Sequence, residues 1–445
     1  MRTAPRNLAA PLAALLVAAV LLTTTAAQSR LPSSQHWVAT WGTAQLAYRT
    51  PAQPAPATPP AAQPPTPAPA PAPGTPQRRF GIPKGLPGLN NQTIRMIVRT
   101  SIGGSQVRVR LSQAFGAPAV TIGAAHIGVG ADGASIVPGS DRVLTFSGQP
   151  ATTLYAGQVV VSDPVALDVR PLSDLAVSLF FPGETGPPTS HTFGLRPTYV
   201  STSGDTTAAA TMTDFATTAE SYYWLSGVDV AAPASAGALV TFGDSITDGD
   251  QSTPDTLGMW PAVLATRLQA NRATAGVGVV NAAISGNRVL GDNNSGVARL
   301  ARDVLAVPGV RWMTMMEGIN DITGATRSGQ AGKSFTAETL IAAYRQVIET
   351  AHAEGVQVIG CTLTPYGGSN VFTDEGEAIR QAVNTWIRTG KGFDAVIDFD
   401  AATRDPQTPS RFRPEADSPD LLHPANPGYA LMAGAVDLKL FTGSR

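Results

Sequence analysis

Cysteine is almost absent from this sequence. Cys361 is its only one, which excludes an intramolecular disulfide framework and any multi-cysteine zinc site. Histidine is also scarce: none of the five is paired at HxxxH spacing, so no metal is expected. Charged residues make up only 14%, and 31 Lys and Arg balance 32 Asp and Glu. Binding to phosphates needs a basic surplus, so nucleic acid is not an expected partner.

Long apolar runs are confined to the N-terminus. Residues 1–27 have the features of a secretory signal: Arg2 and Arg6, an apolar run over 8–22, and small residues at 25–27. The alternative is a membrane anchor, but the run contains Pro11 and is shorter than the roughly 20 residues that span a bilayer. We therefore predict a signal peptide, a secreted or periplasmic mature protein, and no membrane span.

The 445 residues, 43% of them hydrophobic, suffice for two or three domains. Residues 28–231 are predicted to form an all-β sandwich or jelly-roll-like domain, because apolar residues recur at period two and no helical period is present. The strand-like runs lie at 36–41, 93–99, 106–111, 120–129, 143–146, 158–161 and 175–181. The Pro/Ala-rich stretch at 51–76 is predicted to be a solvated polyproline insert, with a proline-recognition ligand as the alternative.

Two details of this region give specific expectations. Gly103-Gly104 separates the runs at 93–99 and 106–111, which predicts a hairpin. Arg108 and Arg110 alternate with apolar residues, and we interpret them as a solvated strand face rather than a site for an acidic ligand.

Residues 232–445 show a different pattern, in which apolar runs alternate with helix-like stretches. This pattern predicts a parallel sheet buried on both faces in a three-layer, doubly wound domain. The predicted strands lie at 238–242, 277–284, 310–316, 356–363 and 395–399, and the predicted helices at 260–269, 297–305, 336–351, 375–388 and 428–440. Ligands of such domains bind beyond the carboxyl ends of the strands.

Chemically informative residues follow those strand ends. Ser245 follows the first strand within Gly-Asp-Ser-Ile-Thr, and a serine on such a turn can act as a nucleophile if a base takes its proton. His423 can be that base, and Asp420, three residues earlier, can orient it. The amide of Gly286 after the second strand and the side chain of Asn320 after the third can converge on an oxyanion.

These four blocks, in this order, resemble the SGNH, or GDSL-type, hydrolase superfamily, which is named for a Ser, a Gly, an Asn and a His. The resemblance covers about residues 236–441. It implies a flavodoxin-like fold, no cofactor, Ser245 as nucleophile, His423 as general base and then acid, and Asp420 as its orienting partner. It also implies an oxyanion hole made by the Ser245 amide, Gly286 and Asn320. Thr247 stands where the G-x-S-x-G motif of α/β-hydrolases has its last glycine.

Neighbouring acidic residues are given structural interpretations. Asp244 is expected to hold its turn, Asp321 to cap or stabilise the turn after the third strand, and Glu317 to pack at a strand end. Asp248 and Asp250 are interpreted as exposed turn residues, with a carboxylate pair for a metal as the alternative. Outside the blocks, the four remaining histidines, His191 among them, have no nearby nucleophile, and Cys361 is expected in the core.

The predicted function is an exported serine esterase that forms an acyl-enzyme. Its expected partner is a small ester or an acylated carbohydrate, as in a carbohydrate acetylesterase or a short-chain aryl or lipid esterase. The alternative is a non-catalytic glycan- or surface-binding protein with an inactive hydrolase domain. The aromatic segment at 221–225 is expected to bring the β-domain against the catalytic end of the sheet. The alternative is that it forms the last strand of the β-domain and contacts nothing catalytic. The sequence gives no oligomeric state.

Overall fold

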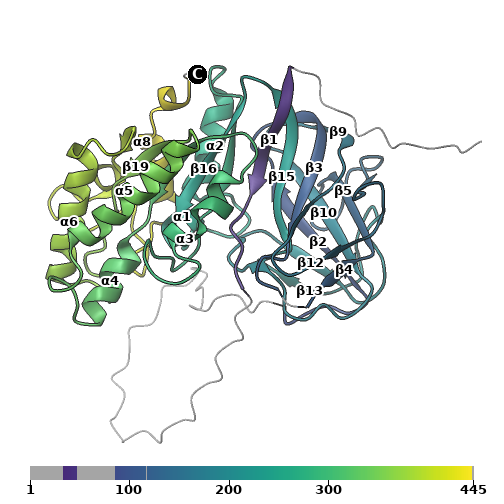
Figure 1. Ribbon diagram of the computed structural model, residues 1–445, viewed down its shortest axis with the longest axis horizontal. Coiled ribbons are helices and arrows are strands. Elements are labelled where there is room, and N and C mark those ends of the chain that lie inside the picture. The colour runs from purple at the N-terminus through teal and green to yellow at the C-terminus, as the bar shows by residue number, and fades with distance from the viewer. Residues whose placement is uncertain (1–33, 48–85, 117, 443–445) are drawn as a thin grey trace, which may run out of the picture. The chain divides into compact units, whose positions relative to one another are not determined.

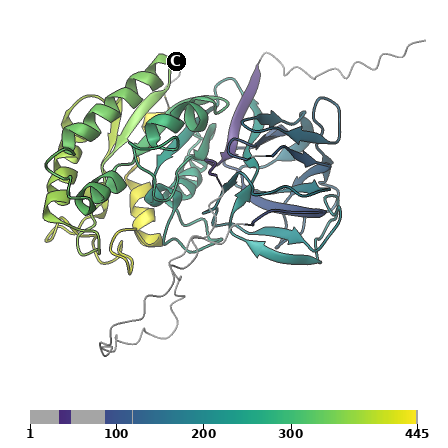
Figure 2. The same ribbon diagram turned by 60° about the horizontal axis from the view of Figure 1, so that its bottom comes forward.

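The computed structural model describes residues 34–47, 86–116 and 118–442. The predicted signal peptide at 1–27 and the Pro/Ala-rich stretch at 51–76 lie outside these residues. Antiparallel strands occupy the described chain as far as residue 233, and strands alternate with helices from residue 237 onward (Figures 1 and 2). The predicted fold class is confirmed: a β-rich N-terminal region precedes a parallel α/β sheet.

Two antiparallel sheets make up most of the β-rich region. The first contains β1 (Gln35–Gly42), β15 (Leu225–Pro233), β3 (Gly104–Ser112), β8 (Val159–Val161) and β9 (Val165–Val169). The second contains β13 (Phe215–Ala219), β12 (Thr198–Ser201), β2 (Gln92–Arg99), β10 (Asp174–Phe181), β5 (Ala124–Val129) and β6 (Arg142–Val143). Two small pairs join β11 (Ser190–His191) to β14 (Tyr222–Tyr223) and β4 (Val120–Ile122) to β7 (Thr152–Leu154). Apolar side chains of both large sheets share one core, as in a sandwich.

The hairpin predicted around Gly103-Gly104 is wrong, because β2 and β3 lie in different sheets. A two-residue hairpin turn needs a positive φ, and neither glycine has one. The glycines allow close packing instead: a Cβ on Gly103 would collide with the Val169 carbonyl, and one on Gly104 with the Ala231 carbonyl. The chain between the strands is held by Thr40, whose hydroxyl accepts hydrogen bonds from the amides of residues 101 and 102.

The alternation of apolar and charged residues in β3 is confirmed, but Arg108 and Arg110 bind a buried carboxylate rather than forming a solvated face. Val107 and Val109 are fully buried. Arg108 and Arg110 place their Nε atoms 3.0 and 3.1 Å from the two oxygens of Asp229, which is itself buried in the adjacent strand β15. A buried carboxylate needs such partners, so the arginines stabilise the pairing of β3 with β15.

The parallel sheet has the order β17-β16-β18-β19-β20, which is the doubly wound order 2-1-3-4-5. Its strands are β16 (Gly237–Gly243), β17 (Val277–Asn281), β18 (Val310–Met316), β19 (Gln357–Cys361) and β20 (Ala395–Ile397). One face is covered by α2 (Trp260–Ala270), α7 (Phe399–Thr403) and α8 (Asn426–Ala435), and the other by α3 (Gly296–Leu300), α4 (Ile319–Arg327), α5 (Ala337–Ala353) and α6 (Asp374–Thr389). Short helices α1 (Ser245–Asp248), η1 (Ala301–Leu305) and η2 (Leu438–Phe441) complete the region.

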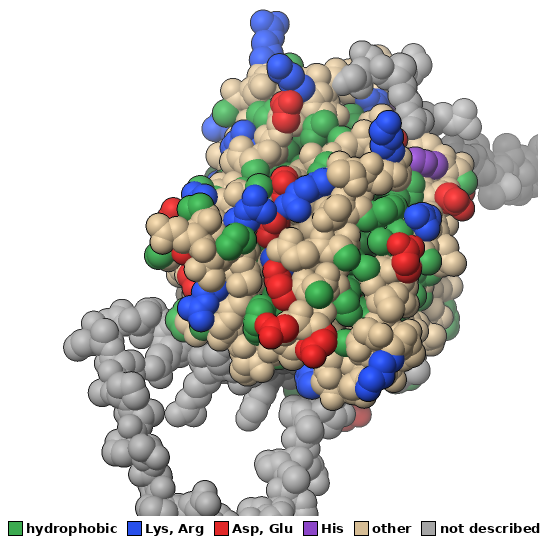
Figure 3. Space-filling model, turned by 90° about the vertical axis from the view of Figure 1, so that its left-hand side faces the viewer, with side chains coloured by type: hydrophobic (Ala, Val, Ile, Leu, Met, Phe, Trp, Pro, Cys, Tyr) green, Lys and Arg blue, Asp and Glu red, His purple; other side chains and the backbone are tan. Residues whose placement is uncertain are grey.

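Helical periodicity places the apolar side chains of the long helices on the sheet. In α5, Leu340, Tyr344, Val347 and Ala351 are buried at spacings of three and four residues. The outer face of this region, on the left of Figure 1, carries acidic and basic side chains interspersed among uncharged ones (Figure 3).

Several predicted elements are shorter than the apolar runs that suggested them. The run at 277–284 leaves the sheet after Asn281, and the run at 120–129 is divided between β4 and β5 at Gly123. The helix predicted at 297–305 continues α3 as the π-helix η1, and that at 428–440 stops at residue 435 before η2 begins. An apolar run indicates burial, and the loops and turns that follow these elements are buried as well. The apolar runs are therefore longer than the strands and helices they contain.

Strand β1 joins the β-rich region to the edge of the parallel sheet. Thr43, just after β1, forms an isolated parallel bridge with Asn281, and the amide of Val279 donates to Ser101 Oγ at 2.8 Å. One hydrophobic cluster continues from the antiparallel sheets into β16 and β18. Cys361, as expected, lies in the core, only 1% exposed, and burial raises the pKa of its thiol.

Candidate active site

The first site residue stands where β16 runs into α1. Asp244 caps that helix, and its Oδ1 accepts from the amide of Ile246 at 3.1 Å, so it holds the turn as expected. Ser245 is therefore the first residue of the helix, with 6% of its surface exposed. Gly243 lets the turn pass close to β18, because a Cβ there would collide with the Met316 carbonyl. The serine hydroxyl thus lies at the carboxyl end of β16, which runs between β17 and β18.

Ser245, His423 and Asp420 form one hydrogen-bonded line. The Oγ of Ser245 lies 2.7 Å from Nε2 of His423, and Nδ1 of the same ring lies 2.6 Å from Oδ2 of Asp420. The other carboxylate oxygen accepts from the amides of Leu422 and His423, both at 2.9 Å. A carboxylate only accepts, so Nδ1 carries the proton and the lone pair of Nε2 faces the serine hydroxyl.

The electrostatics of this line fit a base and its partner. Burial alone would raise the pKa of Asp420, but hydrogen bonds from His423 and the nearby amides lower it to about 2. Burial would lower the pKa of His423, yet the hydrogen bond to Asp420 and the charge of Asp250 raise it above its ordinary value. Asp420 thus stays ionised while His423 titrates.

The other two predicted residues follow the strands on either side of β16. Gly286 lies in the loop after β17 with φ +77°, and nothing lies within 4 Å of where its Cβ would be. Asn320 is in the first turn of α4, after β18, and its Nδ2 donates to the carbonyl of Asn287 at 3.0 Å. An amide group has two N–H bonds, so one more remains for a ligand. The sheet order therefore brings Ser245, Gly286 and Asn320 to adjacent strand ends. His423 and Asp420 come from the segment before α8.

A model of the GDSL-like lipase/acylhydrolase family matches residues 241–431. This part of the chain is a GDSL-like acylhydrolase domain. This domain makes the chain a carboxylic ester hydrolase.

Solved structures similar to this chain include a GDSL-like lipase from Bacteroides thetaiotaomicron, 18% identical, with a TM-score of 0.33, covering 44% of this chain and 84% of that one. Another is an acetylxylan esterase from Geobacillus stearothermophilus, 24% identical, with a TM-score of 0.35, covering 45% of this chain and 91% of that one. No curated protein matches the chain.

A buried arginine, which no sequence pattern indicates, links the strand ends of the acylhydrolase domain. Arg299 is fully buried on α3, its guanidinium lies 3.8 Å from the centre of the Phe242 ring, and it donates to the carbonyls of Gly243 and Ala282 and to Oδ1 of Asn287. It thereby links the ends of β16 and β17. Nothing in the local pattern of α3 distinguishes it from an exposed arginine, because its partners other than Asp303 lie 12 or more residues away in the sequence.

Glu317 and Asp321 lie beside this arginine. Glu317 packs at the end of β18 as expected, with one oxygen 3.4 Å from Arg299 and the other without a hydrogen-bond partner in the described structure. Burial raises the pKa of Glu317 to about 8 and that of Asp321 to about 6. Asp321 lies in the first turn of α4, and its carboxylate accepts from the amides of Val289 and Leu290, so it holds the loop after β17.

The interpretation of Asp248 as an exposed turn residue is wrong. Asp248 is 3% exposed, and its two oxygens bind His191 and Ser285. The sequence predicts no nucleophile near His191, yet this histidine contacts Asp248 in the helix that begins at Ser245. Asp250 is three-quarters buried, with its Oδ2 3.9 Å from Nε2 of His423. Over residues 34–47, 86–116 and 118–442, no group of His, Cys, Asp and Glu is arranged to hold a metal ion.

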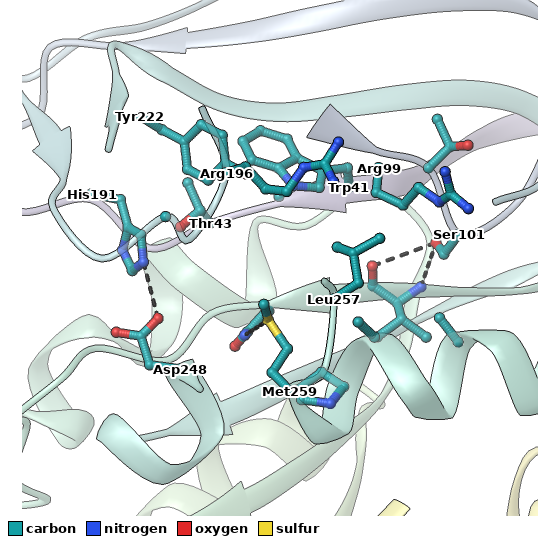
Figure 4. Close-up of a pocket in the computed structure, with 18 of the residues that line it drawn as sticks. Trp41, Thr43, Arg99, Ser101, His191, Arg196, Tyr222, Asp248, Leu257 and Met259 are labelled. Carbon is teal, nitrogen blue, oxygen red and sulfur yellow. Dashed lines mark hydrogen bonds and ion pairs between the residues drawn. The ribbon is translucent and has the colours of Figure 1, made fainter. Parts of the chain in front are cut away.

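A cavity of about 120 Å³ lies between the β-rich region and the acylhydrolase domain (Figure 4). Trp41 and Tyr222 form one wall, with ring centres 4.7 Å apart, and Leu257 and Met259 form the other. Of the aromatic segment at 221–225, Tyr222 lines this cavity, whereas Trp224 is buried in the β core against Phe181. The helices among the described residues include none that is long and apolar enough to cross a membrane.

Proposed function

We propose that the chain is a serine esterase in which Ser245, His423 and Asp420 act as a catalytic triad. The continuous hydrogen bonding from the Ser245 hydroxyl through the His423 ring to Asp420 carries this proposal. It puts a hydroxyl, an acceptor nitrogen and an ionised carboxylate in the arrangement that acyl transfer requires.

In the first half-reaction, Ser245 Oγ bonds to the ester carbonyl carbon while its proton passes to Nε2 of His423. The tetrahedral intermediate then expels the alcohol oxygen, which takes that proton and leaves as an alcohol. In the second half, water gives its proton to Nε2 and attacks the acyl carbon. The bond to Oγ breaks, Oγ recovers the proton, and the carboxylic acid leaves.

The oxyanion that forms in both halves needs donors placed in advance. We propose the amides of Ser245 and Gly286 and the side chain of Asn320 as those donors, because their three strand ends are adjacent in the sheet. The open space beside Gly286 leaves room for part of the substrate. None of these steps requires a metal or a cofactor.

The proposed substrates are short-chain esters of simple alcohols or acylated carbohydrates. p-Nitrophenyl esters from acetate to decanoate and acetylated xylan, assayed with purified full-length protein, will rank them. We further propose that the chain is exported, on the pattern at 1–27, and N-terminal sequencing of protein from the culture medium or periplasm tests this.

Ser245→Ala tests the nucleophile. A fluorophosphonate should label the parent chain at Ser245, identified by mass spectrometry, and Ser245→Ala should neither be labelled nor hydrolyse esters. Ser173→Ala, which removes a hydroxyl from a turn of the β-rich region, serves as the matched control and should keep full activity. Ester hydrolysis by Ser245→Ala within tenfold of the parent would contradict the proposal, and an inactive parent chain would favour a binding role.

A further inference from the structure

The carboxylate of Asp248 connects two parts of the chain that are distant in sequence. Asp248 ends the short helix α1, three residues after Ser245. Its Oδ2 accepts from both the amide and the hydroxyl of Ser285, at 2.8 and 2.9 Å. Its Oδ1 lies 3.0 Å from Nε2 of His191. One buried side chain thus joins α1, the loop after β17 and a histidine of the β-rich region. The dashed line in Figure 4 marks its contact with His191.

His191 donates from both ring nitrogens. Nδ1 lies 2.9 Å from the backbone carbonyl of Ala44, and a carbonyl can only accept. Nε2 faces the carboxylate of Asp248, which also accepts. Burial lowers the pKa of His191, but the charge and hydrogen bond of Asp248 raise it above its ordinary value. The β-rich region therefore places a cation against a carboxylate that is itself 3% exposed.

The contact between His191 and Asp248 matters for the loop after β17, because Ser285 directly precedes Gly286, a proposed oxyanion donor. The loop has little side-chain packing at that point, since nothing lies within 4 Å of where a Gly286 Cβ would be. The two hydrogen bonds to Asp248 hold the peptide that leads into Gly286. Without His191, the same carboxylate would be buried without a counter-charge and would turn toward water or other donors.

We propose that His191 is a positioning residue for ester hydrolysis, which acts through Asp248 and Ser285 to fix the Gly286 amide relative to Ser245. The β-rich region thereby completes the active site of the acylhydrolase domain. This inference rests on the proposed function of Ser245 and Gly286.

The test compares His191→Leu and His191→Gln in the full chain with p-nitrophenyl acetate. Misplacing an oxyanion donor affects the transition state more than the bound ester, so His191→Leu should lower kcat by about 10- to 100-fold and change KM less than about twofold. Gln keeps an N–H donor for Asp248, so His191→Gln should recover part of that loss. Fluorophosphonate labelling of Ser245 should slow in parallel.

His126→Leu is the matched control. His126 lies on β5 and its Nδ1 is 2.9 Å from Asp141, a histidine–carboxylate contact of similar length that lies within the β-rich region. This variant should keep the kcat of the parent. If His191→Leu does not fold, as judged by its thermal unfolding, the His191→Gln variant carries the comparison.

Ser285→Ala supplies a second arm. It removes the hydroxyl donor to Asp248. Because His191 and Ser285 both act through that carboxylate, the double variant His191→Gln/Ser285→Ala should lose less kcat than the product of the two single fold-losses. An unchanged kcat in both His191 variants, an effect on KM alone, or an equal loss in His126→Leu would overturn the inference. Activity that survives Ser245→Ala would instead overturn the proposed function.

Discussion

Asp250 Oδ2 lies 3.9 Å from Nε2 of His423, the same ring nitrogen that faces the Ser245 hydroxyl. Asp250 therefore adds a second negative charge beside the imidazole, on the side opposite Asp420. The two carboxylates and Asp244 together raise the pKa of His423 against the effect of its burial.

Asp250→Asn should move the acid limb of kcat/KM to lower pH. Only neutral His423 can accept the serine proton, so activity falls as pH drops through its pKa, which lies above the ordinary value of about 6.5. Removing a nearby negative charge lowers that pKa, and the limb follows it. The pH profile of kcat/KM measures the shift, and an unmoved limb would show that Asp250 does not act on His423.

Asp420→Asn should lower kcat on the order of 10⁴-fold, because an amide can donate to Nδ1 and so favours the wrong tautomer of His423. The structure should survive, since the side-chain shape is kept. Asp417→Asn, in the same loop, is the control and should remain near the parent activity. Steady-state kinetics on p-nitrophenyl acetate distinguish the two variants, and similar activities would argue against the orienting role.

Asn320→Ala should cost about 10²- to 10³-fold in kcat with little change in KM, because its hydrogen bond strengthens as the oxyanion forms. Asn271→Ala, at the other end of the sheet after α2, controls for loss of an amide side chain. A rise in KM without loss of kcat would make Asn320 a group that binds the ground state.

Glu317→Gln should reduce the dependence of stability on pH. The pKa of Glu317 is about 8 in the folded chain against an ordinary 4.5, so between these values the unfolded chain loses a proton that the folded chain retains. Stability therefore falls as pH rises through this window. Asp244, with a pKa of about 7, acts in the same direction. Thermal unfolding from pH 5 to 8 should show a shallower slope for Glu317→Gln than for Glu338→Gln on exposed α5 surface.

A fragment that starts at residue 232 should be less stable than the full chain and less active even on p-nitrophenyl acetate. It lacks β1, which packs on β17, and it lacks His191. Residue 232 also lies within β15, which continues to Pro233. Comparison of melting temperature and kcat/KM with the full chain measures both effects; equal values would mean that the β-rich region is only an appendage.

The sequence predicts the parallel sheet well because its strands are buried on both faces and appear as apolar runs. It also predicts residues such as Ser245 and Asn320, which lie in short local motifs. It does not predict the roles of His191, Asp248 and Arg299, because each depends on partners that the fold brings from far along the chain. The Gly103-Gly104 error has the same origin, since those glycines respond to distant backbone carbonyls and not to a turn.

The burial of Cys361 has a practical consequence for spectroscopy. Because the only thiol of the chain is enclosed in β19 and its pKa is raised, maleimide reagents should leave the native protein unmodified. A cysteine introduced at an exposed position would then be the single reactive site. Pairs of such labels, one on β5 and one on α6, would report by fluorescence transfer whether the β-rich region and the acylhydrolase domain move relative to each other during turnover.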